Sequence, residues 1–259
     1  MKKNKIIALL LALMTCLSLV SCKRKEGEES RGLEMTLAEN GAYYVVTGMG
    51  SCKDFDVLIP KEYKGLPVAA IGERAFKGSR VTRITLTENV LYIAENAFES
   101  CGSLSYNELS GICYMGTENN PAYAVISVKI NSDETFAIHK DSKIIADCAF
   151  YDCGMTSLTL PEGITHIGKN AFYSCGELES IELSKSLAYV GDEAFGNCSS
   201  LEKIHLPKSV SHIGASAFMY CAKLAEISFG GTEAEWNALE KSPDWDRDMK
   251  EYTLSFKTE

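Results

Sequence analysis

The chain has 259 residues, with 26 lysines and arginines against 35 aspartates and glutamates, and its formal net charge is −9 at pH 7. This acidic balance argues against a nucleic acid or an anionic membrane surface as partner. The apolar fraction of 46% allows one sizeable core. Globular chains of this length often divide into two domains, but an array of repeats need not.

Residues 1–21 have the features of an export signal. Three lysines stand among the first five residues, and the apolar run 6–19 is shorter than the roughly 20 residues of a membrane-spanning helix. The run ends at Leu-Val-Ser before Cys22, which resembles a bacterial lipobox. The resemblance implies cleavage before Cys22 and lipidation of this cysteine as a membrane anchor. The alternative is ordinary cleavage that leaves Cys22 as a plain thiol.

Residues 22–32 are highly charged and have no apolar side chain after Cys22. Such a composition predicts a disordered tether between the lipid and the folded domain, and a surface helix is the alternative. The following segment, 33–54, is expected to form an N-terminal β cap, together with the apolar residues 57–59. A cap is needed because the first unit of a stacked array would otherwise expose its core.

Residues 55–229 contain an internal repeat. An Ala-Phe pair recurs six times, and its phenylalanines are 22, 52, 22, 23 and 23 residues apart. A cysteine stands three residues after each of the last five phenylalanines, and an Ile-Gly or Val-Gly pair usually comes before the Ala-Phe pair. Leu-x-x-Ile-x-Leu follows the cysteine, as in 178–183 and again in 201–206. The phenylalanines are Phe76, Phe98, Phe150, Phe172, Phe195 and Phe218.

Each part of the repeat has a structural meaning. Ile-x-Leu alternates with period two, which predicts a short strand with Ile181 and Leu183 inward and Ser180 and Glu182 outward. The glycine suits a tight bend with positive φ, and the Ala-Phe pair suits a helical or 3₁₀ turn that faces the core. A single unit buries too little, so the units are expected to stack into a right-handed solenoid with a parallel sheet on its concave face.

The unit from Leu201 to Cys221 resembles the repeat of the BspA-like leucine-rich-repeat proteins, also called the Treponema pallidum type. The resemblance covers 55–229 and is weakest at 104–135. It implies a leucine-rich-repeat-like solenoid, mostly β with short 3₁₀ or helical turns. It also implies a surface-exposed or secreted bacterial protein, since some members are adhesins. The partners that it implies are host matrix proteins, other bacteria or envelope proteins.

An insertion at about 106–135 interrupts the repeat. Two apolar stretches, 112–115 and 123–130, flank the turn-rich segment 116–121, and this pattern predicts a β-hairpin that projects from the solenoid. Similar insertions occur in some members of the family that the repeat resembles. A projecting hairpin would offer a binding surface, because binding residues concentrate on loops over rigid scaffolds. The alternative is a packed decoration on the flank of the sheet.

Residues 230–259 are expected to cap the other end. Thr232 suits the N-cap of a helix with an acidic first turn, which we expect to run to about Lys241. Trp236 is expected to cover the last repeat, and 252–256 to form a final strand. The alternative for Trp236 and Trp245 is a platform for carbohydrate.

The cysteines and histidines predict neither a metal site nor an active site. The repeat cysteines are expected to stack in a buried column, although a column spacing of about 5 Å is compatible with a disulfide. One disulfide among Cys52, Cys113 and Cys148 is left open. His166 and His212 lie two repeats apart, or ~10 Å, which is too far for two ligands of one zinc ion. No catalytic, nucleotide-binding or cofactor-binding motif is present.

The sequence therefore favours a lipid-anchored binding or adhesion protein of the bacterial envelope, at the outer membrane or cell surface. It is predicted to act through protein partners and not as an enzyme. The alternative is a structural or assembly protein of the envelope without a soluble ligand. The outward sheet positions and two tyrosines of the insertion are the candidate contact residues. They are Arg83, Thr85, Ser157, Thr159, Ser180, Glu182, Lys203, His205, Glu226, Ser228, Tyr114 and Tyr123. The sheet positions could also be merely solvated.

Overall fold

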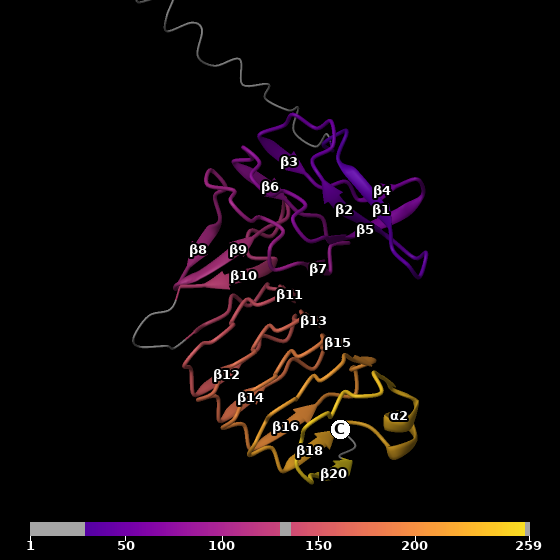
Figure 1. The fold of residues 1–259 in the computed structure, drawn as a ribbon, viewed down its shortest axis with the longest axis vertical. Coiled ribbons are helices and arrows are strands. Elements are labelled where there is room, and N and C mark those ends of the chain that lie inside the picture. The colour runs from indigo at the N-terminus through magenta and orange to yellow at the C-terminus, as the bar shows by residue number, and fades with distance from the viewer. Residues whose placement is uncertain (1–28, 130–135, 257–259) are drawn as a thin grey trace, which may run out of the picture.

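The structure is a computed structural model that describes residues 29–129 and 136–256. The predicted signal, Cys22 and most of the predicted tether lie outside these ranges. Within them, no helix combines the length and the apolar character needed to cross a membrane. The chain forms a solenoid whose turns follow an arc from the N-terminal to the C-terminal end (Figure 1). The predicted repeat solenoid is confirmed.

Each turn contributes two short strands, where the sequence predicted one. The Ile-x-Leu segments form the first set. They are β3 (Asp56–Leu58), β6 (Arg83–Thr85), β12 (Ser157–Thr159), β14 (Ser180–Glu182), β16 (Lys203–Leu206), β18 (Glu226–Phe229) and β20 (Thr253–Phe256). Two-residue strands just before the corner form the second set, and Gly168, Gly191 and Gly214 follow three of them. They are β11 (Ile144–Ile145), β13 (His166–Ile167), β15 (Tyr189–Val190), β17 (His212–Ile213) and β19 (Glu240–Lys241).

The two sets lie on opposite sides of the arc. Figure 1 shows β11, β13 and β15 on the inner side and β12, β14 and β16 on the outer side. The expectation that the Ile-x-Leu strands line the concave face is therefore wrong. The second strand was missed because two residues are too few to show an alternating pattern in the sequence.

The N-terminal cap is a five-stranded sheet that leads into the inner strands. It contains β1 (Glu34–Leu37), β2 (Tyr44–Gly48), β4 (Glu62–Tyr63), β5 (Leu66–Ile71) and β7 (Tyr92–Ile93). β1 and β2 are antiparallel, whereas β2, β5 and β7 are parallel. β2 thus pairs antiparallel with β1 on one side and parallel with β5 on the other, and the parallel pairing continues through the repeats.

The Ala-Phe pair forms the corner of each turn, and its rings stack along the core. The ring centroids of Phe150, Phe172, Phe195 and Phe218 are 5.1, 5.2 and 5.5 Å apart in succession. All four side chains are fully buried. The backbone N–H of Phe172 donates to the carbonyl of Ala194 in the next turn, at 2.8 Å. The small alanine thus leaves room for the neighbouring backbone while the large phenylalanine fills the core.

The repeat cysteines bond one turn to the next. The thiols of Cys175, Cys198 and Cys221 each donate to the carbonyl oxygen of the phenylalanine in the preceding turn, at 3.1, 3.1 and 3.0 Å. A cysteine fits here because it is a small apolar side chain with one weak donor. The eight cysteines within the described residues are free thiols.

The repeat glycines do not have the positive φ that the sequence predicted. Gly191 donates from its backbone N–H to Ile167 of the preceding turn, at 2.9 Å. A Cβ on Gly191 would lie 2.7 Å from the backbone carbonyl carbon of Gly168. Glycine is required here because adjacent turns approach too closely for any side chain. Positive φ occurs instead two residues later, at Asn170, Glu193 and Ser216.

The insertion is a three-stranded antiparallel sheet and not a hairpin that projects from the solenoid. It contains β8 (Asn107–Leu109), β9 (Ile112–Met115) and β10 (Ala124–Val128). β10 pairs in parallel with β11, so the insertion joins the inner sheet of the repeats. β9 is buried along its length, whereas β8 is exposed. The two apolar stretches that predicted a projecting hairpin fill the core between two groups of repeats.

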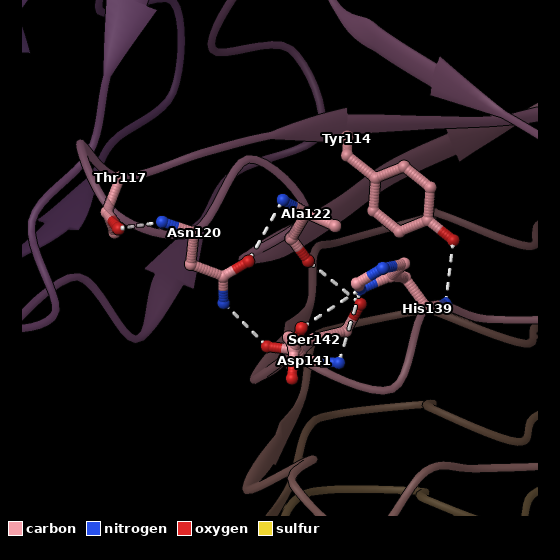
Figure 2. A network of polar contacts seen from close by, with 7 residues as sticks. All are labelled: Tyr114, Thr117, Asn120, Ala122, His139, Asp141 and Ser142. Atoms are coloured by element: carbon pink, nitrogen blue, oxygen red, sulfur yellow. Dashed lines mark hydrogen bonds and ion pairs between the residues drawn. The ribbon is translucent and has the colours of Figure 1, made fainter.

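Polar contacts fix the turn of the insertion on the next repeat (Figure 2). The side-chain amide of Asn120 donates to the carbonyl of Asp141 at 2.6 Å, and its oxygen accepts the N–H of Ala122 at 3.1 Å. The hydroxyl of Ser142 donates to the carbonyl of Ala122 at 2.9 Å. Each of these bonds joins backbone to side chain, so this turn is held in one conformation.

The C-terminal cap contains α2 (Glu233–Ala238). Thr232 is its N-cap and forms a capping box with Glu235, as the sequence predicted for Thr232. The helix ends earlier than expected, because Leu239 is extended and β19 then pairs with β17. Trp236 and Trp245 are 5% and 7% exposed and pack on the last phenylalanines, so neither is a carbohydrate platform.

Candidate functional site

The outward positions of the Ile-x-Leu strands have the register that the sequence predicted. Ser157 pairs with Ser180, and Thr159 pairs with Glu182. Lys203 pairs with Glu226, and His205 pairs with Ser228. We call these positions, from Ser157 to Ser228, the outer face. The side chains contact each other across turns, as in the 3.2 Å bond from the Thr159 hydroxyl to the Glu182 carboxylate.

The structure does not bring all ten positions into one surface. β3 with β6, β12 with β14, and β16 with β18 and β20 form three separate sheets. Arg83 and Thr85 lie on β6, beyond the insertion, where they line a separate hollow of about 600 Å³. Arg83 is paired with Asp56. The insertion thus divides the predicted surface.

Three predicted contact residues are inaccessible. Ser228 is 4% exposed, and its hydroxyl lies 2.9 Å from Nδ1 of His205. Tyr114 is 1% exposed and accepts a hydrogen bond from the N–H of His139. Tyr123 is 4% exposed and donates to the carbonyls of Glu88 and Val90. Both rings belong to the core of the insertion, which removes them as aromatic anchors for a partner.

The inner side of the arc carries a different set of residues. A groove of about 670 Å³ runs along it, and we call it the inner groove. Its lining extends from Asn40 and Tyr43 of the N-terminal cap to Glu240 of the last inner strand. Between these ends it is lined by Tyr92, His166, Tyr189 and His212, with Lys169 and Asp192 beside them.

The rings of the inner groove form a ladder. His166 and Tyr189 stack with centroids 5.7 Å apart, and Tyr189 and His212 stack at 4.5 Å with only 3° between their planes. They occupy the same position in successive turns, because β13, β15 and β17 pair in register. Stacking covers the faces of the inner rings, so a ligand in the groove would meet mainly their edges.

Burial and neighbouring charges change the titration of this ladder. Burial lowers the pKa of His166 and so favours the neutral imidazole. Burial, with the nearby carboxyl of Asp192, raises the pKa of Tyr189. His212 lies 3.6 Å from a carboxylate oxygen of Glu240, an ion pair whenever this histidine is protonated.

Asp147 lies beside the ladder and is buried. Burial raises its pKa to about 6, although it accepts hydrogen bonds from the hydroxyl of Tyr92 and the N–H of Lys169. Burial and the same carboxyl also raise the pKa of Tyr92. The pair therefore holds one carboxyl group and one phenol in fixed orientation at the side of the groove.

The inner groove offers hydrogen-bonding groups and charges to a ligand. No three His, Cys, Asp or Glu side chains in the described ranges lie close enough to hold a metal ion. A groove that is open along its length, with polar ring edges and carboxylates, suits an extended partner.

The ladder could be found in the sequence in part. His166 and His212 were recognised as equivalent positions, but Tyr92 and Tyr189, which stand directly before the same Ile or Val, were not included. The sequence signal for the ladder is a ring residue directly before the Ile-Gly or Val-Gly pair in successive repeats. It was missed because the Ile-Gly pair was interpreted as a bend and not as a strand.

The family can now be stated. The model described as the BspA type leucine-rich repeat region matches residues 61–119 and 127–241 in six copies. These residues are more than half of the chain, which therefore belongs to the BspA-type leucine-rich-repeat family.

Solved structures of similar proteins are bacterial. The T. pallidum leucine-rich-repeat protein is 20% identical, with a TM-score of 0.35, over 87% of this chain and 100% of its own. A leucine-rich cell surface protein from Faecalibacterium prausnitzii is 28% identical, with a TM-score of 0.43, over 73% of this chain and 63% of its own. The pneumococcal vaccine antigen PcpA is 20% identical, with a TM-score of 0.48, over 78% of this chain and 54% of its own. This chain thus spans about half to two thirds of the length of the F. prausnitzii protein and of PcpA. No curated protein matches it.

Proposed function

We propose that this chain is a lipid-anchored protein of the bacterial envelope that binds a protein partner in the inner groove and so mediates adhesion. The observation that carries the proposal is the groove itself, which is continuous from Tyr43 to Glu240 and is lined by a ladder of ring edges. Tyrosine is enriched at protein interfaces because it combines apolar area with a hydrogen-bonding group.

The outer face is the second candidate. Its exposed side chains are short or charged and include no aromatic residue among the predicted positions, whereas interface centres favour Trp, Tyr and Arg. The register supports a regular surface, and many copies on one cell would raise its avidity. The inner groove is favoured because it combines concavity, aromatic rings and an uncompensated negative charge.

The lipid anchor rests on the sequence before Cys22, which lies outside the described residues. The family and the cell-surface protein from F. prausnitzii support a location at the envelope. Cys22→Ser is expected to abolish acyl labelling and to leave the unprocessed precursor. Normal labelling and processing of this variant would exclude Cys22 as the lipidated residue.

Adhesion of cells to surfaces coated with matrix proteins or with other bacteria tests the function. Glu240→Lys reverses a charge whose side chain is 78% exposed, so it changes the inner groove with little effect on the fold. The matched control is Glu182→Lys on the outer face, which is also exposed. We expect Glu240→Lys alone to reduce adhesion. Reduction by Glu182→Lys alone would move the contact to the outer face.

The alternative is a structural or assembly role in the envelope without a soluble ligand. Labelling of intact cells separates the two, since an adhesin must be accessible from outside. Full protection of the chain in intact cells, with labelling only after lysis, would favour the structural role.

A further inference from the structure

A small side pocket opens next to the inner groove, with a volume of about 140 Å³. The two hollows share Tyr92 and Lys169 in their lining. The side pocket is also lined by Glu73, Glu95, Asn96, Asp147 and Asn170. These residues come from four corners of the solenoid, so the side pocket is a product of the stacking.

We propose that the side pocket receives the ammonium group of a lysine side chain, carried by a partner polypeptide that lies in the inner groove. The inference deepens the proposed function and rests on it for the identity of the partner. The inference specifies the chemical group of the partner that enters the side pocket.

The charge of the two hollows is the first argument. Five carboxylates and one lysine line them. The carboxylates belong to Glu73, Glu95, Asp147, Asp192 and Glu240. A concave surface with walls of low dielectric concentrates the field of such charges, and a cationic partner is favoured.

Unsatisfied acceptors are the second argument. The side-chain oxygens of Asn96 and Asn170 are buried and have no hydrogen-bond partner. Both residues line the side pocket. A buried acceptor without a donor is unfavourable, so either amide gains free energy by turning its oxygen toward a ligand that supplies donors.

The form of the side pocket is the third argument. An ammonium group has three donors and no acceptor, which matches a lining of carboxylate and amide oxygens. It is compact, and the flexible lysine stem can carry it into a small hollow, whereas the planar guanidinium of arginine is larger. A divalent cation is not favoured, since no three ligating side chains converge in the described ranges.

The occupant is a polypeptide and not a free amine because the side pocket opens into the groove. A chain lying along the ring ladder can place one lysine in the side pocket while its backbone contacts the hydroxyl of Tyr189 and the imidazole of His212. A small diamine could fill the side pocket but would leave most of the 670 Å³ groove without contacts.

The test is titration calorimetry of the full chain in nonionic detergent with a tetralysine peptide that is acetylated at its N-terminus and amidated at its C-terminus. Glu73→Gln with Glu95→Gln removes two exposed charges of the side pocket. Glu177→Gln with Glu179→Gln is the matched control, because these two glutamates are also exposed but line neither hollow. Both double variants change the net charge equally.

We expect the first double variant to bind tetralysine about tenfold more weakly than the native chain, and the control to bind within about twofold of it. Acetylation of the lysine ε-amines should abolish binding, and cadaverine should bind more weakly than the peptide. Equal weakening in both double variants, or undiminished binding of the acetylated peptide, would overturn the ammonium pocket. Equal affinity for cadaverine would overturn its assignment to a polypeptide.

The outcome separates this inference from the proposed function. If adhesion is lost in Glu240→Lys but unchanged in the glutamine double variant, the groove is supported as the contact surface. The same result contradicts a role of the side pocket in adhesion. The converse result is that tetralysine binds as expected while adhesion is unchanged in both Glu240→Lys and the double variant of Glu73 and Glu95. This result would support the ammonium pocket and contradict adhesion through the groove.

Discussion

The inner and outer sides of the solenoid are built from the same repeat, yet they differ in strand length and in the side chains that they carry. On the outer face, strands of three or four residues carry short polar side chains, and the sheet is broken into three parts. On the inner side, strands of two residues follow one another without a break from β11 to β19 and end at glycine in three turns. The aromatic rings stack on this side.

This difference shows that strand length is a poor guide to which side is suited to binding. The inner strands are two residues long, and ring stacking joins the side chains of successive turns there. The outer strands are longer and were easier to predict, but their side chains are more widely solvated. The close approach that requires glycine is also what assembles the ring ladder.

The largest expected effect concerns the core that both sides share. Phe172→Ala should lower the free energy of unfolding by about 3–5 kcal/mol, because its ring is buried between two stacked rings. Phe256→Ala is the control, since this ring is 37% exposed in the last strand, and its effect should be much smaller. Denaturant unfolding measures both. Equal midpoints would contradict a continuous stacked core.

A smaller effect is expected from the close approach on the inner side. Gly191→Ala should lower the free energy of unfolding by about 2–3 kcal/mol, because the added methyl group meets the backbone of the preceding turn. At Gly176 the nearest atom to an added Cβ is the Ser199 hydroxyl at 3.6 Å, so Gly176→Ala should change stability little. If the two variants have the same stability, the turns do not require glycine on the inner side.

Asp147 gives the inner side a dependence of stability on pH. Its folded pKa of about 6 lies above the ordinary 3.8, so its contribution to stability is present below pH 3.8 and lost as the pH rises through about 6. Between pH 4 and pH 7, the native chain should lose about 2 kcal/mol relative to Asp147→Asn. Parallel stability curves for the two proteins would show that the carboxyl is not perturbed. Tyr92, Lys169 and Glu95 are the groups that face it.

The smallest effect is expected on the outer face. Changing Ser180, Glu182, Lys203 and His205 together to alanine should alter the free energy of unfolding by less than about 1 kcal/mol, since exposed positions contribute little individually. Thermal unfolding followed by circular dichroism is sufficient for this comparison. A loss as large as that of Gly191→Ala would mean that the outer face holds the turns together.

The sequence predicted the solenoid because its repeat places large apolar residues at fixed spacing. Ile181, Phe172 and Cys175 are all buried as expected, and each position recurs often enough to be recognised. The N-cap at Thr232 was also predictable, since a capping box is a local signal. These features depend on residues close together in the chain or identical in successive turns.

The features that were missed depend on contacts between turns. The glycine after β13, β15 and β17 has two possible reasons, a positive φ or a close approach, and only the neighbouring turn distinguishes them. The burial of Tyr114 and Tyr123 likewise follows from the way the insertion joins β11, which no local pattern shows. The side pocket combines residues of four turns, so composition alone could not indicate it.

Site-specific photocrosslinking in intact cells tests most directly whether the inner groove, and not the outer face, contacts the partner. A benzophenone amino acid would replace Tyr189 on the inner side or Glu182 on the outer face of the full-length chain. We expect a crosslinked protein adduct from position 189, lost on addition of Glu240→Lys, and none from position 182. Adducts from position 182 alone, or from neither position, would contradict the account.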